Sequence, residues 1–154
     1  MSAQAAAQDP EVVQFLRVRV GEHDCAIEVG RVSDIAETTD LTDVPGTADV
    51  VVGVGQLRGE LTVVIDGAGV LGSGEGRATG SRAVALEREG GGTRLAIQVD
   101  DVDGLVDVHV DDISPDAPAD LTSAAFKATA TTGDADLGVV DVDYVSSYAT
   151  EVIG

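Results

Sequence analysis

The sequence predicts an all-β protein made of two packed, five-stranded barrels with little helix. Its apolar residues are mainly Val, Ile, Leu and Ala, with two Phe, two Tyr and no Trp. β-Branched side chains favour strands over helices. From residue 12 onward, apolar residues alternate with polar ones over short windows that Gly and Asp interrupt. This spacing is typical of half-buried strands. The second half of the chain also repeats apolar spacings of the first half, which indicates two similar units.

Two hairpins are expected in the first half of the chain. Residues 13–20 alternate, lead into the turn Gly21-Glu22-His23-Asp24, and are followed by the apolar residues of 26–29. Residues 49–54 and 61–65 then flank Gly55-Gln56-Leu57-Arg58-Gly59-Glu60. The two glycines of this segment can adopt backbone angles closed to other residues, as a tight turn requires. Residues 51–66 are therefore predicted to be a strand, a turn and a second strand.

The internal repeat supports a duplicated β-unit. The spacing Ala26-Ile27-x-Val29-x-x-Val32-x-x-Ile35 recurs 70 residues later as Ala96-Ile97-x-Val99-x-x-Val102-x-x-Leu105. Leu61-x-Val63-Val64 recurs 76 residues later as Leu137-x-Val139-Val140. Spacing and order agree in both cases, as a repeat requires. Each unit has room for about five strands, which can close into a small barrel and hide their edges.

These patterns divide the chain. The first barrel is placed at about 12–72, the second at about 81–148, and residues 72–80, with four glycines, form the connection. Exchange of strands between the two barrels is left open. Residues 1–11 and 149–154 are expected to be tails. Single helical turns are expected near 67–71 and 123–129.

The charge is strongly acidic. The chain has 28 Asp and Glu against 9 Lys and Arg, a formal net charge of −19, and Lys127 is the one lysine. Such a surface repels itself in dilute buffer, but at ~1 M salt the Debye length falls to about 3 Å. We interpret the acidity as adaptation to a salt-rich cytosol; an acidic surface for a basic partner is the alternative. Nucleic acid and anionic membranes are poor partners for this charge.

Cysteine usage and the N-terminal residues indicate a cytoplasmic protein. Cys25 is the single cysteine, so no intrachain disulfide can form. Residues 1–10 lack the basic start and apolar run of a signal peptide, and no stretch approaches the ~20 apolar residues of a membrane span.

Catalytic and metal-binding patterns are missing from the sequence. His23 and His109 lack the paired ligand spacing of a zinc site, and there is no Walker loop or nucleophile elbow. The acidic segment 99–110 has Val at the first and twelfth positions of a calcium loop, where side-chain oxygens are needed. Cys25 lies among apolar residues and is interpreted as a core residue. We therefore expect no enzyme activity, no cofactor and no metal.

Three runs of residues resemble the CheW family, the adaptors of chemotaxis signalling arrays. They are residues 18–32, Val44-Pro45 and residues 53–66, which the family writes as a strand, Asn-Leu-Arg-Gly, a strand and Asp. Here Gln56 replaces the Asn, and Gly67 stands where Leu is usual. Residues 94–102 resemble the hairpin of the family's second barrel, and residues 137–144 its closing strand. The resemblance covers about residues 12–148.

The resemblance implies two SH3-like barrels and a non-enzymatic coupler. Such a protein joins a CheA-type histidine kinase, through its regulatory domain, to the cytoplasmic tips of methyl-accepting chemoreceptors. It is cytoplasmic and is recruited to membrane-associated receptor arrays without entering the membrane.

The resemblance also implies site residues. Asp34 falls where the family has a Glu that pairs with the Arg of the Leu-Arg-Gly turn, here Arg58. The receptor-binding residues expected from it are Val32, Asp34, Gly53, Arg58, Val99 and Asp100. The kinase-binding residues expected on the first barrel are Leu41, Val44, Val50, Val63 and Leu71.

Each role has an alternative. Arg58 and Asp34 can be a plain surface ion pair, which contributes only about 0 to 1 kcal/mol, and Val32 and Val99 can be ordinary core residues. The protein can also serve a kinase pathway other than motility. A small-ligand-binding barrel is a more remote alternative, which requires a pocket with convergent polar groups.

Overall fold

A computed structural model describes residues 11–38, 41–42, 50–71, 82–87, 93–118 and 124–153, with the backbone alone for residues 150–153. Strands dominate this part of the chain, as the all-β prediction requires. Two short 3-10 turns, η1 (Val29–Arg31) and η2 (Val110–Asp112), and two helices, α2 (Gly67–Leu71) and α3 (Val142–Ile153), accompany them. The strands are β1 (Val12–Val20), β2 (His23–Glu28), β3 (Val32–Glu37), β4 (Val51–Leu57), β5 (Glu60–Asp66), β6 (Arg82–Leu86), β7 (Arg94–Val99), β8 (Asp101–His109), β9 (Ile113–Ser114), β10 (Phe126–Thr131) and β11 (Asp136–Val140).

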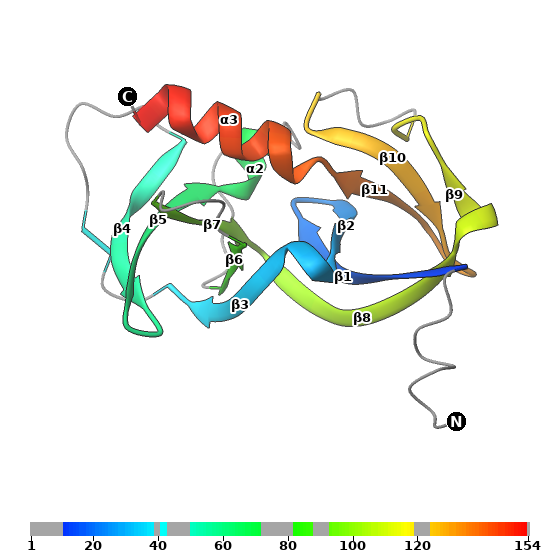
Figure 1. The fold of residues 1–154 in the computed structure, drawn as a ribbon, viewed down its shortest axis with the longest axis horizontal. Helices are drawn as coiled ribbons and strands as arrows, with labels where there is room; N and C mark the ends of the chain where they lie inside the picture. The colour runs from blue at the N-terminus through cyan, green and yellow to red at the C-terminus, as the bar shows by residue number, and fades with distance from the viewer. Residues whose placement is uncertain are drawn as a thin grey trace.

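The strands form two sheets that stand side by side (Figure 1). The six-stranded sheet has the order β8-β1-β2-β11-β10-β9, and the five-stranded sheet has the order β3-β6-β7-β5-β4. Both predicted hairpins are present: β1 and β2 join through a two-residue turn, and β4 and β5 join through another. The prediction of two small, SH3-like β-units is confirmed, and the short strand β9 adds a sixth strand to one of them.

The two sheets repeat one arrangement. Strands β8, β1, β2, β11 and β10 follow the same order as β3, β6, β7, β5 and β4. In each sheet one neighbouring pair is parallel, β2 with β11 and β7 with β5, and the other pairs are antiparallel. The repeated sequence spacings fall on these equivalent strands, because 26–35 covers β2 and β3 while 96–105 covers β7 and β8. The predicted duplication is therefore visible in the topology.

The two sheets do not follow one another along the chain. The five-stranded sheet takes its strands from residues 32–99, and the six-stranded sheet takes its strands from residues 12–28 and 101–140. One unit is thus inserted into the other, by the exchange that the sequence left open. The predicted connection at 72–80 lies outside the described residues, and the strands on either side of it, β5 and β6, belong to one sheet.

Helix α3 corrects the predicted end of the chain. The expected closing strand at 137–144 stops at Val140, and residues 142–153 are helical where a tail was expected at 149–154. The Asp141 carboxylate accepts a hydrogen bond from the backbone N–H of Tyr144 at 3.1 Å and so caps the helix. The helix then crosses above the five-stranded sheet (Figure 1).

The sequence also predicts two single helical turns and an N-terminal tail. The helical turn expected at 67–71 is α2, whereas the turn expected near 123–129 is wrong from Phe126 onward, where β10 begins. Of the N-terminal tail, residues 1–10 lie outside the described part. Glu11 is fixed, because its carbonyl accepts from the Val110 N–H at 2.7 Å.

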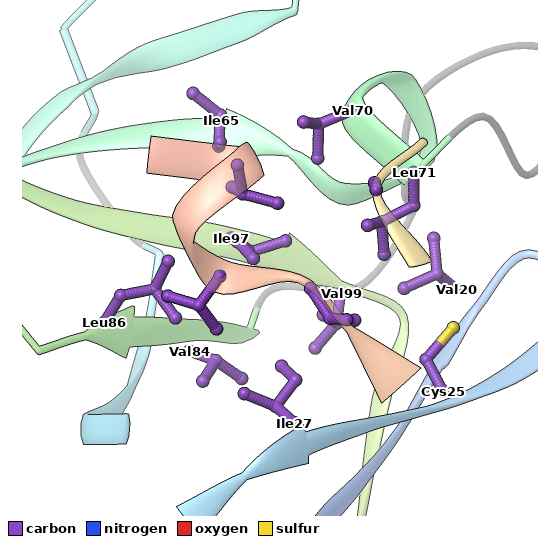
Figure 2. Close-up of a cluster of buried hydrophobic side chains, with 14 of the residues drawn as sticks. Val20, Cys25, Ile27, Ile65, Val70, Leu71, Val84, Leu86, Ile97 and Val99 are labelled. Carbon is purple, nitrogen blue, oxygen red and sulfur yellow. The ribbon is translucent and has the colours of Figure 1, made fainter. Parts of the chain in front are cut away.

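The largest apolar cluster lies between the two sheets. It includes Ile27 from β2, Ile65 and Ile97 from the five-stranded sheet, and Val145 from α3, all 1% exposed or less. Figure 2 shows side chains of both sheets pointing into this space beside α3. Two smaller clusters, rich in Ala, each belong to one sheet. The sheets therefore share one core, which fixes their relative position.

Candidate functional site

The β4–β5 hairpin turns through Arg58 and Gly59, and both residues have positive φ, 55° and 80°. Positive φ at both central positions is the geometry of a type I′ turn, which matches the twist of the flanking strands. Gly adopts it freely, whereas Arg58 does so as a non-glycine residue. This turn places the Arg58 side chain beside β3.

Arg58 pairs with Asp34 as expected. Its Nε lies 3.1 Å from Oδ2 of Asp34, and its Nη2 donates to the carbonyl of Ile35 at 3.3 Å. The other carboxylate oxygen of Asp34 accepts from the Ile35 N–H at 2.8 Å, which orients it. The Arg58 side chain is 65% exposed. Its guanidinium is therefore held along one edge while the rest of it faces solvent.

Arg58 and Asp34 line a groove of about 390 Å³ between the two sheets, here called the β3–β8 groove. The lining residues are Leu16, Val29, Val32, Ser33, Asp34, Ile35, Arg58 and Leu105. Five of these are aliphatic, and the one acid and the one base are paired with each other. The groove thus combines aliphatic side chains with polar surface that includes the Arg58–Asp34 ion pair.

Leu105 supplies the wall on the six-stranded sheet, and its side chain is 62% exposed. It follows Gly104, whose φ is 106°, and the pairing of β8 with β1 shifts register nearby, between Arg17 and Val18. A bulge of this kind re-aims the following side chain. Sequence reasoning missed Leu105, because an alternating Leu in a strand predicts burial; Gly104 was the available signal.

Only some of the other residues expected to bind the receptor line the groove. Val32 lines the groove, but Val99 is fully buried in the shared core and belongs to the five-stranded sheet. This burial agrees with the alternative that Val99 is an ordinary core residue. Asp100 accepts from the Gly21 N–H at 2.6 Å and so ties the β7–β8 connection to the β1–β2 turn.

Gly53 does not line the groove either. A Cβ built on it would lie 2.9 Å from the carbonyl oxygen of Thr42. Thr42 bridges to Val54 through two backbone hydrogen bonds of 2.8 Å at the edge of β4. Glycine at position 53 thus gives room for the approach of residues 41 and 42.

Most of the expected kinase-binding side chains are in the core. Val50, Val63 and Leu71 are 9%, 7% and 1% exposed, so neighbouring residues cover most of each. Leu41 is partly exposed, and Val44 lies outside the described residues. Leu61, on the neighbouring strand β5, is 61% exposed and was not predicted.

Arg94 is a further charged residue beneath the hairpin that the sequence did not single out. Its side chain is 8% exposed and lies 3.4 Å from Glu60 and 3.8 Å from Asp34. It therefore reaches the same carboxylate as Arg58 from the buried side.

Cys25 lies away from the groove, in the shared core. Burial, with a smaller contribution from the negative charge of Asp24, raises the pKa of its thiol to about 12. The nucleophilic form of cysteine is the thiolate, so this environment opposes reactivity.

Within the described residues, no three His, Cys, Asp or Glu side chains are grouped so as to hold a metal ion. No helix in the described part has the length and apolar character needed to cross a membrane.

Comparison with known proteins agrees with the fold. A crystal structure of the scaffolding protein TtCheW from Thermoanaerobacter tengcongensis superposes with a TM-score of 0.73 at 23% sequence identity, covering 84% of this chain and 88% of that one. No curated protein matches the sequence significantly. Residues 14–148 match the family described as the CheW-like domain. This match spans most of the chain and both sheets, and the chain therefore belongs to the CheW-like domain family.

Proposed function

We propose that the chain is a non-enzymatic chemotaxis scaffold, which couples a CheA-type histidine kinase to the cytoplasmic tips of chemoreceptors. Family membership and the fold support a scaffold. The observation that carries the proposal is the β3–β8 groove, which is lined by five aliphatic side chains together with the Arg58–Asp34 pair. In this proposal the protein is cytoplasmic and joins receptor arrays at the membrane by binding proteins.

The chemistry of the groove suits a helix. An amphipathic helix binds by laying an apolar stripe into a hydrophobic groove, and Leu105 and Val32 offer apolar surface from the two walls. Arg58 then offers its outward-facing donors to an oxygen acceptor on the helix. A planar guanidinium suits this role because it presents several N–H groups in fixed directions.

The kinase is assigned to the outer part of the five-stranded sheet. There Leu41 and Thr42 lie along the edge of β4, and Leu61 extends from β5. An exposed leucine beside a strand edge suits contact with another β-domain, because backbone pairing and apolar burial can act together. The two proposed binding surfaces are distinct, as a coupling protein requires.

Reconstitution tests the proposal. Purified receptor-tip and kinase fragments from the same organism are mixed at multimolar KCl with and without this chain, and kinase autophosphorylation is followed. The expected result is a ternary complex and a change in kinase activity that needs all three components. Absence of both would refute the coupling function.

A further inference from the structure

The starting point is a buried guanidinium with long contacts. Arg94 begins β7, and its side chain is 8% exposed. Burial of a charge is unfavourable unless partners compensate it. The Nη1 of Arg94 donates to the Leu57 carbonyl at 3.4 Å and lies 3.4 Å from Glu60, while its Nη2 lies 3.8 Å from Asp34. Its Nε and Nη2 are buried and make no hydrogen bond within the described part of the chain.

The three partners of Arg94 all lie next to Arg58. Leu57 and Glu60 flank the Arg58–Gly59 turn, and Asp34 is the carboxylate to which Arg58 binds. Oδ2 of Asp34 thus lies between two guanidinium groups, Arg58 on the exposed side and Arg94 on the buried side. The four charged side chains carry two positive and two negative formal charges.

Removal of Arg94 would change this balance. Asp34 and Glu60 would then compete for Arg58, two residues from Glu60 in the same hairpin. An exposed side chain with two alternative partners loses a fixed orientation, because a single solvent-exposed pair is weak. Arg94 instead draws Glu60 and Asp34 inward, which leaves Arg58 in one position along the rim of the groove.

We propose that Arg94 is a positioning residue: from beneath the hairpin it holds the Asp34 carboxylate and the Leu57–Glu60 turn, so that Arg58 is presented over the β3–β8 groove. Its effect on binding rests on the proposed function, in which this groove takes a receptor tip. Its effect on the orientation of Arg58 does not depend on any partner.

The test uses the full chain at multimolar KCl with two readouts. The first is the affinity for a purified helical-hairpin fragment of a chemoreceptor tip from the same organism. The second is the NMR signal of the Arg58 Nε–H, whose shift and hydrogen-exchange rate report whether the guanidinium stays in its ion pair with Asp34. The variants are Arg94→Met, which removes the charge, and Arg94→Lys. Arg94→Lys keeps the positive charge but loses the planar guanidinium group.

Arg17→Met is the matched control. Arg17 is also a largely buried Arg with a buried, unpaired Nε, and it pairs with Asp24 and Asp134 outside the groove. We expect Arg94→Met to weaken binding roughly tenfold or more and to accelerate Nε–H exchange of Arg58, with partial recovery in Arg94→Lys. Arg17→Met should lower the melting temperature and leave both readouts unchanged.

The outcomes separate the two proposals. A wild-type chain that does not bind the fragment refutes the receptor role of the groove, and the Arg58 signal still decides the role of Arg94. An unchanged Arg58 signal in folded Arg94→Met overturns the positioning role. Should Arg94→Met fail to fold, an unchanged signal in Arg94→Lys overturns it as well.

Discussion

Arg58 combines an unusual backbone with an exposed side chain. Its positive φ fits the tight β4–β5 turn, and its guanidinium is held by Asp34 and the Ile35 carbonyl while most of it faces solvent. An exposed pair of this kind is weak and is screened by salt. Recognition of a partner explains its position better than stability does.

Arg58→Ala should therefore separate binding from stability. We expect weaker association with a receptor-tip fragment, and a change of less than about 1 kcal/mol in the free energy of unfolding at high salt. Arg19→Ala is the matched control, because Arg19 forms another exposed pair, with Asp101 at 3.6 Å. Titration calorimetry and chemical denaturation measure the two quantities. A large loss of stability with unaltered binding would make the pair purely structural.

Cys25 provides a probe of the shared core. Its thiol is fully buried and has a pKa raised to about 12, so thiolate is scarce at neutral pH and inaccessible to reagents. We expect a thiol reagent to label the native protein at the rate of global unfolding, and to label one group per chain at once in denaturant. Rapid labelling under native conditions would show that the two sheets separate without unfolding.

At the scale of the elements, the packing of helix α2 depends on Gly67. A Cβ at Gly67 would lie 2.4 Å from the carbonyl oxygen of Gln98 on β7 and 3.2 Å from the Ile97 side chain. This close approach accounts for the glycine at position 67, because α2 lies directly against β7. A larger residue must push these elements apart.

Gly67→Ala is accordingly expected to destabilise the fold by about 1 to 3 kcal/mol, the usual range for overpacking. Gly133→Ala is the control, since nothing lies within 4 Å of a Cβ built there. Urea denaturation of both variants gives the comparison. Equal stabilities would show that α2 shifts without cost.

The start of α3 carries a pH-sensitive contact. The Arg31 guanidinium, 2.8 Å from Asp143, holds the pKa of that carboxyl below its usual range. A lowered pKa in the folded state stabilises the fold above the pKa of the unfolded state, and this contribution is lost as the pH falls through the folded value. Asp143 is exposed, so the contribution is small.

Melting temperatures of wild type and Asp143→Asn should then differ most near neutral pH and converge as the pH falls through the lowered pKa of Asp143. The measurement needs modest salt, because exposed pairs are screened. In a chain that already carries Arg31→Gln, the further substitution Asp143→Asn should leave the melting temperature unchanged. A difference that persists in strong acid would point to packing of α3 instead of the ion pair.

The elements also show what local sequence can predict. Hairpins β1–β2 and β4–β5 were predictable, because alternation and the glycines at 21 and 59 act within a few residues. Helix α3 had local signals too, a capping Asp141 and apolar Val142, Val145 and Ala149 at helical spacing, but its first residues were interpreted as strand. The burial of Arg94 depends on distant residues and leaves no local pattern.

The pairing of strands is another feature that local sequence does not predict. Alternation identifies a strand but says nothing of its neighbours, and the parallel pairing of β2 with β11 joins residues more than 100 positions apart. The resemblance located the Arg58–Asp34 pair correctly, because Arg58 lies in the run 53–66 and Asp34 lies two residues after the run 18–32. It could not decide whether Val99 faces a groove or the core, because an apolar residue in a strand has the same pattern in both cases.

At the scale of the whole molecule, the main feature is the large excess of negative charge. The formal net charge is −19, and the described part of the chain already holds six basic residues in ion pairs, namely Arg17, Arg19, Arg31, Arg58, Arg94 and Lys127. Few basic side chains therefore remain to neutralise the excess of carboxylates. Cations from the dissolved salt must neutralise it instead, and their concentration determines how strongly the carboxylates repel one another.

Dialysis from multimolar to low KCl should therefore unfold the protein. Far-UV circular dichroism and melting temperature as a function of KCl measure the effect, with sucrose at matched osmolality as the control for general exclusion effects. A chain that is equally stable at low salt would contradict the proposed adaptation to a salt-rich cytosol.

The insertion of one sheet into the other has a consequence for synthesis on the ribosome. The five-stranded sheet takes its strands from residues 32–99, whereas the hairpin β1–β2 must wait for β8 and β11, which are synthesised after the whole of that sheet. At typical translation rates this delay is on the order of ten seconds. The β3–β8 groove needs walls from both sheets, so a chain interrupted before residue 105 has no complete groove. Under the proposed function, nascent or truncated chains would therefore not compete with the finished protein for receptor tips.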